Sequence, residues 1–85
     1  MAKRFPEWWE WELAFSAELP DRMRDRQFNE ADLRMMLADA TEWEPDKEPG
    51  RFIVYGRRGK ERWEIIVEPD VVARLLVAIT AFRVR

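Results

Sequence analysis

The sequence predicts one α+β domain, spanning residues 1–85, in which two helices pack on a curved antiparallel sheet of three to four strands. Three observations lead to this two-layer sandwich. Residues 19–40 carry apolar side chains at helical spacing. Residues 51–84 hold three segments rich in β-branched and aromatic residues, separated by turn signals. A chain of 85 residues supports a single domain. The predicted order is strand, helix, helix and three strands (β-α-α-β-β-β).

The first predicted strand covers residues 8–15, where Trp9, Trp11, Leu13 and Phe15 recur at period two. Trp8 points away from that face, so it either caps the small core or meets a partner. Five tryptophans are more than a core of this size readily hides. We therefore predict that Trp8, Trp9 and Trp11 bind a partner, with a homo-oligomer as one form of that contact.

Two short helices follow. The first covers Leu19 to Gln27, with Pro20 in the first turn, where a missing N–H breaks no hydrogen bond. The second begins after Asn29, a favourable N-cap, with Asp32 at the capping-box position. Its apolar stripe consists of Leu33, Met36, Leu37 and Ala40.

The second half of the chain predicts a meander. Residues 41–50 form an acidic linker broken by prolines and a glycine, and residues 51–68 form a hairpin that turns at residues 57–60. Residues 75–84 form the last strand, while the 8–15 strand joins at an edge. The expected core comprises Leu33, Met36, Leu37, Trp63, Ile65, Val67, Val77 and Ile79.

Composition removes several classes of site. The chain has no cysteine and no histidine, which excludes disulfides, most zinc sites and the catalytic triads that depend on histidine. We expect neither a metal nor a cofactor. The longest apolar run, residues 75–79, is too short to cross a bilayer, and the first residues do not resemble a signal peptide. The expected location is cytoplasmic, away from membranes.

Charge is distributed unevenly along the chain. Residues 1–50 hold thirteen acidic and seven basic residues, whereas residues 51–85 hold four acidic and eight basic ones. Two interpretations stay open: a basic working face, or merely an acidic solvated first half.

Residues Ser16, Arg22, Met23, Arg26 and Phe28, with the tail from Ala78 to Phe82, carry a family pattern. The chain resembles the DUF4258 family over residues 11–84. That family is similar in topology to the small toxin ribonucleases of toxin–antitoxin pairs, including the BrnT and RelE types. The resemblance implies an RNA-cutting toxin, or a relative of one, with RNA as ligand and a cognate antitoxin as protein partner. Two positions depart from the family: Glu18 stands where its histidine falls, and Gln27 stands where its glycine falls.

Metal-independent RNA cleavage needs a base, a cation for the phosphate and an acid. We assign the catalytic group to Glu18, Arg22, Arg26 and Arg83, with Glu64 as the alternative base. Arg57, Arg58, Lys60 and Tyr55 form the predicted RNA-binding group, and Tyr55 or Lys60 is the candidate acid.

The rival interpretation is a non-catalytic protein-interaction module that lacks the family histidine. Convergence of Arg22, Arg26 and Arg83 in one cleft would favour the nuclease, whereas separate ion pairs would favour the module.

Overall fold

The computed structural model of the protein describes residues 4–84, so residues 1–3 and Arg85 lie outside it. It is an α+β fold with two α-helices and a five-stranded sheet. In chain order the elements are the 3-10 helix η1 (Glu7–Glu10), β1 (Glu12–Phe15), α1 (Leu19–Arg26), α2 (Glu30–Ala38), β2 (Glu42–Pro45), β3 (Phe52–Arg58), β4 (Glu61–Asp70) and β5 (Leu75–Arg83). The predicted class is confirmed, whereas the predicted count of three to four strands is wrong.

The sheet has the order β1-β5-β4-β3-β2. The predicted meander of β3, β4 and β5 is confirmed, and so is the edge position of the first strand. The prediction of a purely antiparallel sheet is wrong, because β1 runs parallel to β5, with Leu13 opposite Leu76. Parallel neighbours need a long crossover connection, which here contains both helices and the other three strands.

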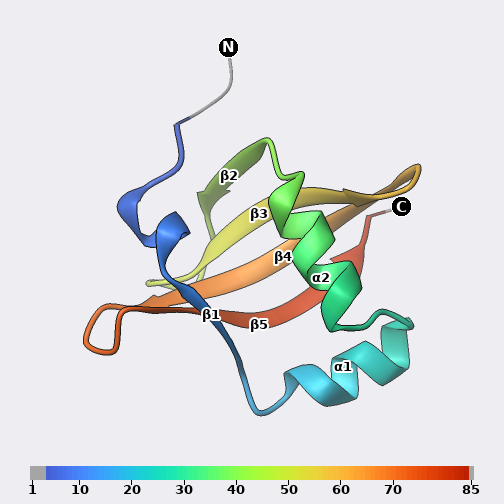
Figure 1. Cartoon of the computed structure of the whole chain (residues 1–85), viewed down its shortest axis with the longest axis horizontal. Coiled ribbons are helices and arrows are strands. Elements are labelled where there is room, and N and C mark those ends of the chain that lie inside the picture. Colours follow the sequence, from blue (N-terminus) through green and yellow to red (C-terminus); the bar gives the residue numbers. More distant parts are fainter. Residues whose placement is uncertain (1–3, 85) are drawn as a thin grey trace.

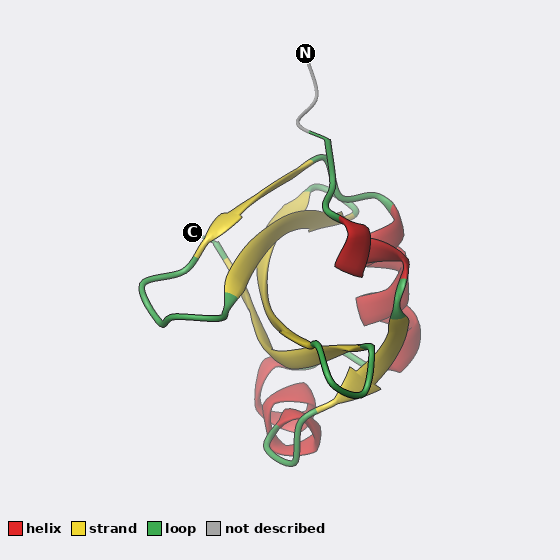
Figure 2. Ribbon diagram, turned by 90° about the vertical axis from the view of Figure 1, so that its left-hand side faces the viewer, coloured by secondary structure: helices red, strands yellow, loops and turns green. Residues whose placement is uncertain are grey.

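The sheet is strongly curled. In Figure 2 the strands form most of a ring, and helical segments close its remaining side. Figure 1 shows α2 in front of the sheet and α1 along its lower edge. Accordingly α2 packs against β3, and α1 packs against β5. The apolar core therefore fills the concave side of the sheet.

Side chains from α2 and the three long strands form most of this core, including Leu33, Met36, Val54, Trp63 and Ile65. The assignment of Val77 to the core was wrong, whereas Ile79 is buried but lies outside the main cluster. The ladder between β4 and β5 shifts register at Ile66/Val67, so Val67 pairs with Ala78 while Ile66 pairs with Thr80. This bulge changes which residues of β5 face the core: Leu76, Ala78 and Ala81.

Two predicted segments have a different local structure. Residues 7–10 are helical rather than extended, because the Trp9 N–H bonds the Pro6 carbonyl at 3.0 Å and the Trp11 N–H bonds the Trp8 carbonyl at 3.1 Å. The predicted linker contains β2, which pairs antiparallel with β3. Pro45 is its last residue, where the absence of an N–H costs the ladder little.

The helix boundaries agree closely with the sequence. Asn29 and Asp32 form a complete capping box at the start of α2. Gln27 ends α1 with φ 55° and ψ 55°, a left-handed conformation that commonly terminates helices. No helix within residues 4–84 is long and apolar enough to span a membrane.

β1 ends at Phe15, so the edge of β5 that faces away from β4 has no strand beside it in its second half. Side chains bond its backbone instead. The Ser16 hydroxyl donates to the Ile79 carbonyl at 2.9 Å, and Arg26 Nη1 donates to the Ala81 carbonyl at 3.1 Å. The sheet edge thus holds the end of α1 and fixes the position of Arg26.

Candidate functional site

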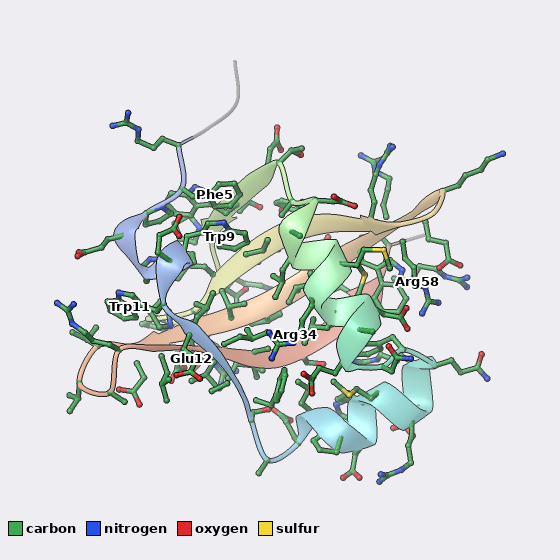
Figure 3. The ribbon with its side chains drawn as sticks, in the orientation of Figure 1. Phe5, Trp9, Trp11, Glu12, Arg34 and Arg58 are labelled. Carbon is green, nitrogen blue, oxygen red and sulfur yellow. The ribbon has the colours of Figure 1, made fainter. Side chains whose placement is uncertain are left out.

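Three arginines from three elements line one hollow of about 450 Å³ at the tip of the β3–β4 hairpin. Arg26 comes from α1, Arg58 from β3 and Arg83 from β5. We call this the arginine hollow; its lining residues are Asp25, Arg26, Gln27, Arg58, Glu61, Trp63, Phe82 and Arg83. In Figure 3 Arg58 lies at the end of the molecule opposite Trp11.

The hairpin turn places Glu61 among these arginines. Gly59, with φ 61°, and Lys60 form a two-residue turn, which sets Arg58 directly opposite Glu61. Arg58 Nη2 then lies 3.2 Å from Glu61 Oε1, and Arg83 Nη1 donates to Glu61 Oε2 at 2.8 Å. One carboxylate therefore bridges two of the three arginines.

Glu61 is a poor general base. The hydrogen bond from Arg83, followed by that from the Trp63 indole N–H at 3.3 Å, holds the pKa of the Glu61 carboxyl below its usual range. An efficient base has a pKa near the working pH. Glu61 instead serves as an ionised carboxylate that orients Arg58 and Arg83.

The three arginines differ in how firmly the protein holds them. Arg58 stacks on the Trp63 ring, 4.8 Å from its centroid, and donates to the Gln27 carbonyl at 2.8 Å. Arg83 has one ion pair, with Glu61, and half of its side chain is exposed (51%). Arg58 therefore braces the site, and Arg83 faces solvent.

Arg26 uses only one nitrogen for hydrogen bonds within the described chain. Its Nη1 donates to Thr80 Oγ1 at 2.7 Å and to the Ala81 carbonyl, while its guanidinium lies 5.9 Å from the centre of the Phe82 ring. Arg26 is exposed and lines the arginine hollow. Arg26 and Arg83 are thus the two side chains best placed to bind an anion.

Two predicted catalytic residues lie outside the arginine hollow. Glu18 is the N-cap of α1, and it pairs with Arg22 at 3.8 Å. Arg22 also pairs with Asp25 at 3.9 Å. The expected convergence is therefore partial, since Arg26 and Arg83 meet, Arg58 joins them, and Arg22 belongs to a separate ion-pair group.

The predicted RNA-binding group is divided between the two faces of the hairpin. Arg58 faces the arginine hollow, whereas Tyr55 and Arg57 line a second hollow of about 550 Å³, and Lys60 is exposed in the turn. We call the second one the hairpin hollow; it is lined by Asp39, Thr41, Glu42, Tyr55, Gly56, Arg57, Arg62, Trp63, Glu64 and Val84. Alternation along a strand places Arg57 and Arg58 on opposite faces.

Tyr55 and Glu64 have no direct access to the arginine hollow. The Tyr55 hydroxyl donates to the Glu44 carboxylate, and this bond is the main cause that raises the pKa of Tyr55 to about 12. Such a phenol is a weak acid at neutral pH. The candidate acid and the alternative base therefore lie together, on the face away from the three arginines.

The three tryptophans of the predicted partner-binding group lie at the other end of the molecule, where Trp8, Trp9 and Trp11 are partly buried. Trp9 stacks on Phe5 with ring centroids 4.2 Å apart, and Trp8 contacts Trp43 and Phe52 at 5.9 and 5.0 Å. Trp11 lies beneath the Arg74 guanidinium. Figure 3 shows Phe5 over Trp9, with Trp11 near the β4–β5 turn. Their packing within the chain attaches η1 to the sheet, and partner binding remains a prediction.

Sequence reasoning missed Glu61 and Arg62. The two-residue turn was the available signal, since it sets Glu61 opposite Arg58 and Arg62 opposite Arg57.

Within residues 4–84 no group of three or more Asp or Glu side chains is arranged to hold a metal ion. Comparison of the chain with protein-family models, curated proteins and solved structures found no match. The resemblance to the DUF4258 family therefore stays a prediction.

Proposed function

We propose that this protein is a small RNA-binding domain, of the kind found in toxin ribonucleases, that binds backbone phosphate in the arginine hollow. The observation that carries the proposal is the meeting of Arg26, Arg58 and Arg83 in one open hollow. Arginine forks match phosphate oxygens in geometry and charge. Glu61 keeps two of these forks oriented before any ligand arrives.

Cleavage, if the domain performs it, is slow. The Glu61 carboxyl in the hollow has a lowered pKa, and Tyr55, whose pKa is raised, lies on the other face. Neither Glu61 nor Tyr55 is therefore well matched to transfer protons to and from RNA oxygens. The arginines contribute binding and charge stabilisation only.

Titration of a fluorescent single-stranded RNA at 50 and 200 mM salt tests the proposal. We expect a Kd of about 10⁻⁴–10⁻⁶ M that weakens with salt, because bound phosphates release counterions. Arg26→Gln with Arg83→Gln should weaken binding about tenfold. Arg24→Gln with Arg34→Gln, which removes the same charge from exposed helix positions, is the matched control.

Equal losses of RNA affinity in the two double variants would show that only net charge matters, and would overturn the proposed site. An RNA incubation followed by gel electrophoresis, with growth of an expressing strain scored beside it, separates a binding domain from an active toxin.

A second candidate function, a protein-interaction module, is favoured by an apolar groove of about 240 Å³ beside β1. Trp9, Trp11, Leu13 and Leu37 line it together with Arg34, Ala38 and Leu76. Sedimentation at micromolar concentration tests self-association through this end of the molecule. A monomer at all concentrations would remove the homo-oligomer.

A further inference from the structure

Arg57 and Arg62 are directly opposite each other on β3 and β4. The Cβ atoms of such a cross-strand pair lie about 4.5–5.5 Å apart, and side chains of like charge in directly opposite positions destabilise a sheet. Both side chains are exposed and line the hairpin hollow.

Ion pairing distinguishes Arg57 and Arg62 from most other arginines of residues 4–84. Six other arginines of the described chain form ion pairs: Arg22, Arg24, Arg34, Arg51, Arg58 and Arg83. Within residues 4–84 no carboxylate forms an ion pair with Arg57 or Arg62. Three acidic residues line the same hollow: Asp39, and Glu42 and Glu64, which oppose Tyr55 from its two sides.

We infer that Arg57 and Arg62 form a second phosphate clamp, one that holds a single phosphate group between two guanidinium forks. This deepens the proposed function and rests on it for the identity of the ligand as RNA. A phosphate between the two side chains would convert a like-charge pair into two charge-assisted contacts. The ligand class is a phosphodiester or a free phosphate group.

The position of the pair suggests the path of the strand. Arg57 precedes Arg58 in the chain but lies on the opposite face, and Trp63 lines both hollows. A single-stranded nucleic acid that crosses the hairpin tip, past Lys60, would therefore place one phosphate in each hollow.

Arg57→Gln with Arg62→Gln tests the clamp in the same RNA titration, against Arg24→Gln with Arg34→Gln. We expect about tenfold weaker binding. Loss of one phosphate contact should also reduce the slope of log K against log salt by about 0.7. Unchanged RNA affinity, alongside a loss in the Arg26/Arg83 variant, would overturn the clamp and leave the proposed function standing.

Inorganic pyrophosphate supplies a readout that does not depend on RNA. It should raise the melting temperature of the unmodified protein at low salt more than that of the Arg57/Arg62 variant, and equal shifts would overturn the clamp. If the unmodified protein fails to bind RNA while this difference persists, the clamp stands and the RNA assignment falls.

Arg62→Glu is a second variant that distinguishes loss of the clamp from loss of folding. It places opposite charges across the ladder, so it should raise the melting temperature and still reduce the pyrophosphate shift below that of the unmodified protein. A stable Arg62→Glu protein with the full shift of the unmodified protein would contradict the clamp.

Discussion

Gln27 holds a backbone conformation that most residues avoid. Gln27 ends α1 with a φ of 55°, in the left-handed region. This conformation costs an L-residue with a Cβ atom about 1–2 kcal/mol of free energy. Its carbonyl accepts a hydrogen bond from Arg58, so the turn is tied to the arginine hollow. The free energy of that link offsets part of the backbone cost.

Gln27→Gly should therefore raise the free energy of unfolding by about 0.5–1 kcal/mol, after the greater freedom of glycine in the unfolded chain is subtracted. Urea denaturation measures the change. Gln27→Ala keeps the Cβ atom and should gain nothing. A glycine variant no more stable than the alanine variant would show that residue 27 carries no backbone strain.

The Tyr55–Glu44 hydrogen bond predicts a loss of stability at high pH. The pKa of Tyr55 is about 12 in the folded protein and about 10 in an unfolded chain. The bond therefore stabilises the fold fully below pH 10, and its contribution disappears as pH rises toward 12. Ultraviolet titration of the single tyrosine reports the folded pKa. In Glu44→Gln the pKa should move back toward 10; a midpoint that stays near 12 would assign the shift to another cause.

At the scale of elements, β3 lies very close to α2 at Gly56. A Cβ atom built there would lie 2.7 Å from the Met36 carbonyl oxygen, a backbone atom that cannot move without shifting the helix. This glycine sets the spacing between helix and sheet.

Gly56→Ala should accordingly lower the free energy of unfolding by about 1–3 kcal/mol, because α2 must retreat from β3. Thermal unfolding followed by circular dichroism measures it. An unchanged melting temperature would mean that α2 moves away at no cost.

Elements with local signals were predicted from the sequence. The two helices, the hairpin and the last strand depend on caps, turns and periodicity, and their boundaries agree within a few residues. β2 could not be predicted, because its sequence of Glu42 to Pro45 has the composition of a loop, and only pairing with β3 makes it a strand. The parallel contact of β1 with β5 also depends on tertiary structure alone.

The site was predictable in part for the same reason. Arg26 and Arg83 were named from residue type and place in the chain. Their convergence depends on the bulge near Val67, which changes the face that each half of β5 presents. Glu61 received no role because the separate chain segments gave no reason to expect Arg83 beside it.

For the molecule as a whole, the sheet order predicts a gradient of local stability. β4 is central and bonded on both sides, whereas β2 is short, lies at an edge and pairs only with β3. Hydrogen exchange followed by NMR should show the slowest amides in β4 and much faster ones in β2, since edge elements open locally at a lower free-energy cost. Equal protection in both strands would indicate that the sheet opens only as one unit.

The pairing of β1 with β5 also sets an order of events during folding. Ser16 and Ile79, which the edge contact joins, are 63 residues apart in the chain. Contacts at such separation form late because a long loop must close first. A nascent chain emerges from its N-terminus, so the tryptophan-rich segment before β1 is synthesised long before the strand that β1 joins. Until β5 is made, this segment is exposed to chaperones and to other chains.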